Sequence, residues 1–145
     1  MSQMTRSQTL QAFFDSIFQM ERQISGAKIT CLRDCELTHP QAELLYLATY
    51  KGEISIKQIG ELLNITSSAA TQLVESLVRK GFMQRLHMED DRRGVHVLLT
   101  PEGAERFKKF KDAHMDFLEK RLSVLTDEEL TIMVALRQKV IDSQK

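Results

Sequence analysis

Residues 59–85, IGELLNITSSAATQLVESLVRKGFMQR, decide which fold the sequence predicts. On either side of Asn64, apolar residues recur at three- and four-residue spacing, which is typical of two amphipathic helices. Asparagine tolerates left-handed backbone angles, so Asn64 is suited to end the first helix and to turn the chain toward the second. Two short helices joined by a tight turn, each with one apolar face, predict a helix-turn-helix.

Polar capping residues mark the limits of these two helices. Ser55 and Gln58 have the spacing of a capping box at the start of the first helix, and Thr66 or Ser67 can cap the second. The second helix is expected to continue to Lys80, where a glycine follows and ends it.

The apolar period changes after Gly81. Residues 82–88 and 95–99 are rich in apolar and β-compatible side chains, and residues 89–94 between them are charged apart from Gly94. This pattern predicts a β-hairpin with a long, charged tip. Because two strands alone are marginally stable, the hairpin is expected to pack against the helices, forming a winged helix with the helix-turn-helix.

Further helices are predicted before this region. Residues 8–25 have the spacing of an amphipathic helix, which is expected to break at Gly26 and at the polar run 33–36. Thr38 then begins another helix, with a proline in its first turn and a capping-box glutamine, and this helix stops at Gly52.

Two helices are also predicted after the hairpin. Thr100 and Pro101 begin a long helix, and Thr126 with Glu129 has capping-box spacing at the start of the last one. The predicted fold class is therefore mainly α: a winged helix-turn-helix domain with a small β-hairpin wing, flanked by N- and C-terminal helices.

Composition excludes several classes of protein. The 145 residues, 42% hydrophobic and 28% charged, suit one soluble domain. The net charge of zero excludes a histone-like polycation, yet residues 51–111 carry 11 basic and 8 acidic side chains. The N-terminus lacks the pattern of a secretory signal, and the apolar stretch near 44–50 is far shorter than the roughly 18 residues of a membrane span. A cytoplasmic protein without membrane contact is expected.

Motifs of catalysis are lacking in the sequence. It contains no phosphate-binding loop, no glycine-rich nucleotide motif and no nucleophile elbow, and its four histidines do not have the spacing of a metal site. We therefore expect a protein that is not an enzyme and that needs no cofactor or metal.

A winged helix suits double-stranded DNA. Its second helix can enter the major groove, while arginines at the hairpin tip suit the negative potential of the minor groove. Arg92 and Arg93 stand at this tip. Taken alone, the charged tip is equally consistent with a solvated turn.

Segment 59–85, followed by 91–95 (Asp-Arg-Arg-Gly-Val) and 99–103 (Leu-Thr-Pro-Glu-Gly), resembles the MarR family of transcriptional regulators. The Asp-x-Arg tip and the Leu-Thr-x-x-Gly run are the most specific parts. The resemblance implies a single domain over residues 1–145, with a winged-helix DNA-binding region at 37–101 and dimerisation helices at 1–36 and 102–145. It further implies a homodimer on inverted-repeat DNA and, commonly, repression relieved by a small-molecule effector or by oxidation.

The resemblance also assigns DNA contacts. It places five residues on the groove-facing side of the second helix: Ser67, Ser68, Ala69, Thr71 and Gln72. Hydroxyls can bind base edges or phosphates, a glutamine can pair with adenine, and an alanine can contact a thymine methyl group. By the same resemblance Arg93 enters the minor groove, Asp91 orients it and Arg92 meets phosphate, while an acid at Glu75 pairs with an arginine for which Arg85 is a candidate.

One departure from the family pattern affects the expected operator. Residues 66–78 contain no basic side chain, whereas relatives often carry one at the position of Gln72 or Ser76. Affinity for the DNA backbone is then expected to come from Arg79, Lys80, Arg85, Arg92 and Arg93, with Lys57 as a further candidate. Since arginine is the usual reader of guanine, we expect A·T-rich half-sites.

Three alternatives remain open at the level of sequence. Cys31 and Cys35, expected in the break between the first two helices, are either two small half-buried apolar residues or a redox switch helped by nearby Lys28 and Arg33. Apolar residues of the first and last helices pack either across a two-fold axis or within one chain. Besides DNA binding, two other functions remain open. The winged helix could bind a protein partner, or the chain could be a thiol-based redox sensor that does not bind DNA.

Overall fold

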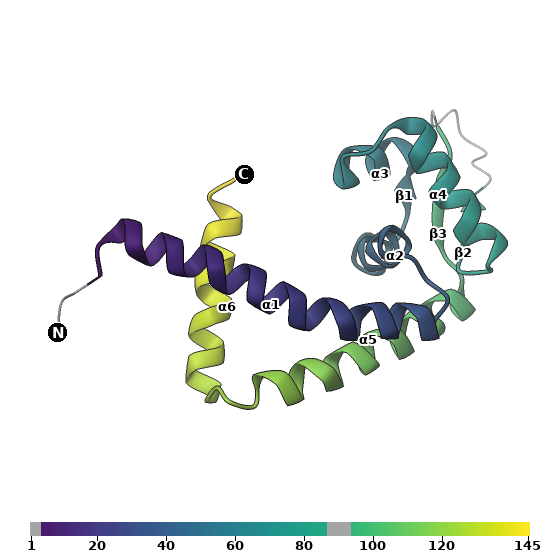
Figure 1. Cartoon of the computed structure of the whole chain (residues 1–145). Helices are drawn as coiled ribbons and strands as arrows, with labels where there is room; N and C mark the ends of the chain where they lie inside the picture. The colour runs from purple at the N-terminus through teal and green to yellow at the C-terminus, as the bar shows by residue number, and fades with distance from the viewer. Residues whose placement is uncertain (1–3, 87–93) are drawn as a thin grey trace. The chain divides into compact units, whose positions relative to one another are not determined.

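The computed structural model describes residues 4–86 and 94–145, and for residues 27–31 it describes the backbone alone. The chain divides into two compact units, Met1–Lys111 and Asp112–Lys145. The elements, labelled in Figure 1, are α1 (Arg6–Asp34), α2 (His39–Lys51), β1 (Ile54–Ser55), α3 (Ile56–Leu63), α4 (Ser67–Arg79), β2 (Met83–Leu86), β3 (His96–Leu99), α5 (Pro101–Leu122) and α6 (Asp127–Asp142). The predicted mainly α fold class is confirmed.

The helix-turn-helix is formed by α3 and α4, with the caps that the sequence predicts. The Ser55 hydroxyl accepts a hydrogen bond from the backbone N–H of Gln58 (3.1 Å), and the Gln58 side chain accepts one from the Ser55 N–H (2.9 Å). Asn64 is left-handed, with φ 53° and ψ 49°, and the Thr66 hydroxyl caps α4 at the N–H of Ala69 (3.1 Å). Each of these bonds satisfies a donor that a helix start leaves unpaired.

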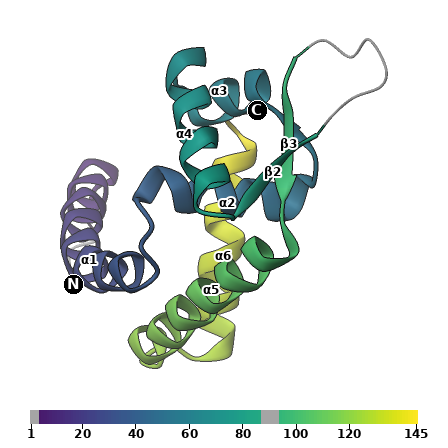
Figure 2. The ribbon, with the colours of Figure 1, turned by 90° about the vertical axis from the view of Figure 1, so that its right-hand side faces the viewer.

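The wing is part of a three-stranded antiparallel sheet with the strand order β1-β3-β2. β2 pairs with β3 from Met83 opposite Leu99 to Leu86 opposite His96, as the predicted hairpin requires. Figure 2 shows these strands side by side and close to α4. Strand β1 was not predicted, because a two-residue strand is too short to carry an alternating pattern.

A close joint connects the start of α5 to the base of the wing. The Thr100 hydroxyl donates to the carbonyl of Gly81 (2.6 Å) and accepts from the N–H of Gly103 (2.8 Å), which confirms the predicted N-cap. Gly81 has φ 80°, a left-handed angle that glycine adopts without strain. Arg106 places its guanidinium 4.0 Å from the ring centre of Phe82. These contacts explain why the Leu-Thr-x-x-Gly run stands directly after the hairpin.

The core of the first unit lies among the helix-turn-helix, α2 and the sheet. Its largest fully buried side chains are Phe82, Leu44, Leu45, Ile54, Ile59, Leu77, Met83, Val74 and Val97. The apolar faces predicted for the helix-turn-helix therefore point inward, with Ala70 and Val74 of α4 completely buried. Burial of one face leaves the opposite face of α4 toward solvent, where it can meet a partner.

The prediction that the first helix breaks at Gly26 is wrong, since α1 runs without interruption to Asp34. One glycine costs a helix only about 1 kcal/mol relative to alanine. The helix ends at the second predicted break, the polar run 33–36, where Glu36 adopts φ 56° and the N–H of Leu37 donates to the carbonyl of Leu32 (2.8 Å). Both leucines are buried, so packing fixes this end.

This longer helix also corrects the location of the cysteines. Cys31 lies within α1 and Cys35 directly after its last residue, not in a break between two helices. The side chain of Cys31 is outside the described residues. Cys35 is half-buried and packs against the core.

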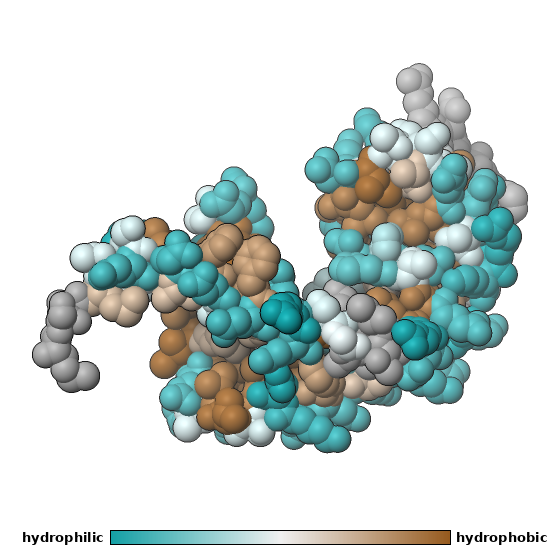
Figure 3. Space-filling model, viewed as in Figure 1, coloured by the Kyte–Doolittle hydropathy of each residue, from teal (hydrophilic) through white to brown (hydrophobic). Residues whose placement is uncertain are grey.

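The second unit contains the end of α5 and all of α6. The predicted capping box is confirmed: the Thr126 hydroxyl accepts from the N–H of Glu129 (3.2 Å), and the Glu129 carboxylate accepts from the N–H of Thr126 (2.9 Å). No residue of α6 is buried. Apolar side chains are exposed on the surface of both units, as the brown areas of Figure 3 illustrate. Within the described part of the chain, no helix combines the length and apolar character of a membrane span.

Candidate nucleic-acid interface

The solvent-facing side of α4 carries small polar side chains. Ser67, Ser68 and Gln72 are exposed, while Ala69 and Thr71 are half-buried. Ser68 and Gln72 are four residues apart, so they lie one above the other on one helix face. The structure thus presents hydroxyl and amide groups, without a charge, along the outer side of the first two turns of this helix, before Glu75 and Arg79.

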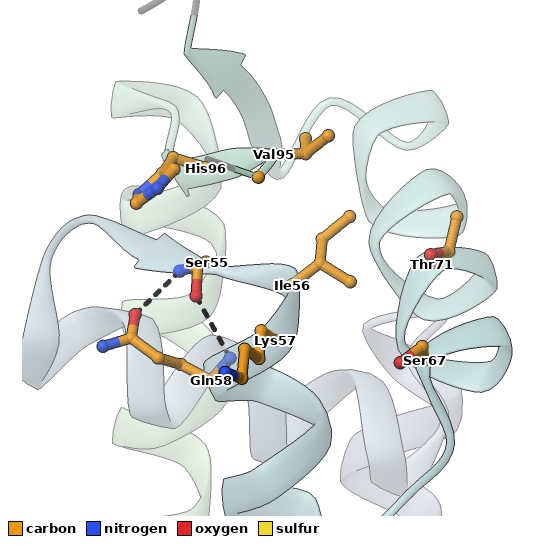
Figure 4. A pocket seen from close by; sticks show the side chains of 9 residues that line it. Ser55, Ile56, Lys57, Gln58, Ser67, Thr71, Val95 and His96 are labelled. Atoms are coloured by element: carbon orange, nitrogen blue, oxygen red, sulfur yellow. Dashed lines mark hydrogen bonds between the residues drawn. The ribbon is translucent and has the colours of Figure 1, made fainter. Parts of the chain in front are cut away.

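An open depression of about 500 Å³ lies beside the start of α4. Figure 4 shows Ile56 extending from the start of α3 toward α4, where Ser67 and Thr71 lie one turn apart. The lining residues are Ser55, Ile56, Lys57, Gln58, Ser67, Thr71, Gly94, Val95 and His96. The depression therefore brings together the starts of α3 and α4 and the base of the wing.

One backbone hydrogen bond and one side-chain contact hold the base of the wing at this depression. The N–H of Ile56 donates to the carbonyl of Val95 (3.0 Å), which links the start of α3 to the residue before β3. His96 Nδ1 lies 2.8 Å from Glu53 Oε1. No sequence pattern pointed to Glu53 or His96, because their proximity depends on the unpredicted pairing of β1 with β3.

The predicted pair between α4 and the first wing strand is confirmed. Arg85 Nη2 lies 3.3 Å from Glu75 Oε1, and about half of each side chain is exposed. An exposed pair of this kind adds about 0–1 kcal/mol to stability. Its more specific effect is to hold the Arg85 guanidinium beside the outer side of α4.

The two basic residues at the end of α4 differ in their surroundings. Arg79 and Lys80 are both exposed, Arg79 as the last residue of the helix and Lys80 as its cap. The Lys80 ammonium donates to the carbonyl of Glu36 (2.6 Å) and to Gln41 Oε1 (3.1 Å). It is therefore oriented by contacts within the protein.

Three of the predicted site residues, Asp91, Arg92 and Arg93, lie outside the described residues. For Cys31 the structure describes the backbone alone. Within the described ranges, no group of three or more potential metal ligands occurs.

The combination of helix-turn-helix, antiparallel wing and long flanking helices agrees with a match to known proteins. Residues 37–95 match the model of the MarR family. This segment, which contains the helix-turn-helix, belongs to the MarR family of transcriptional regulators. Across 91 residues it is 32% identical to the transcriptional repressor MdtR of Bacillus subtilis, a match that covers 61% of this chain and 59% of that protein.

Solved structures of MarR proteins share the fold over nearly the whole chain. A MarR family protein from Bacillus stearothermophilus superimposes with a TM-score of 0.84, covering 97% of this chain and 99% of that one, at 17% identity. A point mutant of Staphylococcus aureus MepR, solved bound to an oligodeoxyribonucleotide, has a TM-score of 0.66 at 21% identity and covers 91% of this chain and 98% of that one. At sequence identities of 17% and 21%, this similarity shows a shared fold and nothing more.

Proposed function

We propose that this MarR-family protein is a homodimeric repressor that binds an inverted-repeat operator in double-stranded DNA. The observation that carries the proposal is the polar, uncharged side of the first two turns of α4, which lies beside the base of the wing. An α-helix fits the major groove of B-DNA, which is about 12 Å wide. The DNA-bound MepR structure, which shares this fold, supports the same use of it.

Base contacts are proposed for the exposed side of α4. Gln72 can pair with an adenine through its amide, the hydroxyls of Ser67, Ser68 and Thr71 can bind base edges or phosphates, and the methyl group of Ala69 can meet a thymine. No lysine or arginine occurs in residues 66–78, so this helix lacks the usual donor to guanine. The proposed half-sites are A·T-rich.

Backbone contacts are proposed for the basic residues around α4. Arg79 follows the polar face, Arg85 is oriented by Glu75, and Lys57 lines the depression. Lys80 has three N–H donors, two of which are engaged within the protein, so it can offer one to a phosphate. By family resemblance, Arg92 meets phosphate and Arg93 enters the minor groove beside Asp91.

A dimer is proposed from the exposed apolar residues of the terminal helices. Phe13 and Phe14 of α1 are 62% and 55% exposed, and Val134 and Ile141 of α6 are 59% and 52% exposed. Surfaces of this kind in a soluble protein mark interaction sites. Two copies related by a two-fold axis present two α4 helices to two half-sites, which doubles the contacts with DNA.

Release from DNA is proposed to follow binding of a small-molecule effector or oxidation of a thiol, as the family resemblance implies. Cys31 and Cys35 are the candidate thiols. A cytoplasmic location, without enzymatic activity, agrees with this role.

Selection from a random duplex library tests the proposal. The full-length protein is expected to enrich an inverted repeat with A·T-rich half-sites centred about one helical turn apart. Enrichment of G·C-rich half-sites would overturn the proposed base preference, and enrichment of single half-sites would overturn the dimer. If no duplex is enriched, with or without reductant, the winged helix serves another purpose such as binding a protein.

A further inference from the structure

Gln41, in the first turn of α2, is a buried polar side chain that connects the start of α2 to Ser76 on α4 and to Lys80, the cap of that helix. Only 5% of it is exposed. Its Nε2 donates to the Ser76 hydroxyl on α4 (3.0 Å), while its Oε1 accepts from the N–H of Thr38 (2.9 Å) and from the Lys80 ammonium (3.1 Å). A buried amide with partners at both of its ends is oriented by them, since leaving any of these groups unpaired is costly.

The Lys80 ammonium extends this network to the end of α1. It donates to the carbonyl of Glu36, the residue whose left-handed backbone closes α1. The backbone carbonyl of Lys80 in turn accepts from Arg106 Nη1 on α5 (2.8 Å). The C-terminal end of α4 is thus fixed by polar contacts to three other helices or their ends.

Ser76 shows why this network matters for the outer face of α4. It lies four residues after Gln72, so the two residues are on neighbouring turns of the same side of the helix. The Ser76 hydroxyl also donates to the carbonyl of Leu73 (2.7 Å), which leaves its oxygen aimed at Gln41. A contact from α2 at this position restricts rotation of α4 about its own axis.

We infer that Gln41 is a positioning residue for DNA recognition, which fixes the rotation of α4 through Ser76 and its C-terminal end through Lys80. The inference rests on the proposed function of α4. Gln41 is buried and does not itself meet DNA. Base pairing by a side chain requires donor–acceptor distances of about 2.7–3.2 Å, so a small rotation of α4 removes base contacts while contacts with phosphate, which are less directional, remain.

The test is a double-mutant cycle in the full-length protein. Gln41→Met keeps the approximate size of the side chain and removes its amide group. Ser76→Ala removes the hydroxyl that accepts the hydrogen bond from Gln41. Thr38→Ala is the matched control, because it weakens the cap of α2 but leaves Gln41, Ser76 and Lys80 in place. Affinities are measured for the selected operator and for a scrambled duplex of equal length, together with urea unfolding.

If Gln41 positions α4, Gln41→Met should lower the affinity for the operator about tenfold. The affinity for the scrambled duplex should fall by less than about twofold. Ser76→Ala should give a partial loss that is not additive with that of Gln41→Met, because both remove the same bond. Thr38→Ala should shift the unfolding midpoint without changing the ratio of the two affinities.

Two results would overturn the inference. In the first, Gln41→Met lowers stability but the folded protein keeps the wild-type affinity ratio, so Gln41 is structural only. In the second, the losses in the two single variants add independently. If the wild-type protein itself does not prefer the operator to the scrambled duplex, the proposed function fails. The inference, which rests on that function, then fails with it.

Discussion

Gly103, in the first turn of α5, lies directly against the backbone of Phe82, the residue before β2. A Cβ atom on Gly103 would overlap the Phe82 carbonyl group, whose oxygen already accepts a hydrogen bond from the N–H of Thr100 (2.9 Å). The glycine of the Leu-Thr-x-x-Gly run therefore allows α5 to begin at the base of the wing.

Gly103→Ala should destabilise the protein by about 1–3 kcal/mol, because the new Cβ atom would overlap the backbone of Phe82 and the first turn of α5 would have to shift. Urea unfolding measures this change. Gly26→Ala is the matched control, since a Cβ at Gly26 meets nothing within 4 Å and the position lies inside α1. It should stabilise the protein by about 0.5–1 kcal/mol. Equal effects of the two substitutions would contradict the close contact.

Arg93→Ala should weaken operator binding by about 1–3 kcal/mol if this arginine enters the minor groove. Fluorescence anisotropy with a labelled operator measures the change. Lys109→Ala, which removes an exposed lysine from α5, controls for the loss of one positive charge. A loss of the same size in both variants would point to overall charge and against a minor-groove contact.

Gln72→Ala should relax sequence preference more than it weakens non-specific binding, because the amide is proposed to pair with adenine. The ratio of affinities for the operator and for single-base variants of each half-site measures this preference. One position is expected to lose about 1–3 kcal/mol of discrimination. Gln144→Ala, at the exposed C-terminal end, should leave the ratio unchanged. Uniform loss across all duplexes would assign Gln72 to the DNA backbone.

Arg85→Ala should weaken binding to operator and scrambled duplex alike, and should reduce the slope of log K against log salt by about 0.9, the value for one phosphate. Glu75→Ala tests the partner of the pair. Since the pair is exposed, Glu75→Ala should change the free energy of unfolding by no more than about 1 kcal/mol. An unchanged salt slope for Arg85→Ala would exclude Arg85 from the backbone contacts.

Local signals allowed much of the fold to be predicted. The caps at Thr38, Ser55 and Thr126 each depend on a partner three residues away, so the sequence contains both members of the bond. The left-handed turn at Asn64 is local in the same way. The long helix through Gly26 was missed, because its end is set by burial of two leucines and not by the glycine.

The site was predicted less completely, because its contacts join distant parts of the chain. The bonds from Gln41 to Ser76 and Lys80 span 35 and 39 residues, and no spacing rule connects such positions. His96 faces Glu53 only because β1 pairs with β3. The Glu75–Arg85 pair was predicted, since the family resemblance supplied what spacing alone did not.

The central claim is that paired copies of this chain recognise a particular duplex sequence through α4. Its most direct test compares the selected inverted repeat with a scrambled duplex of the same length, by equilibrium anisotropy between 50 and 200 mM salt, roughly the range over which phosphate contacts lose affinity. The account predicts tighter binding of the inverted repeat at every salt concentration, two protomers per duplex, and weakening of both complexes as salt rises. Equal affinity for the two duplexes, or no binding to either at the lowest salt, would contradict it.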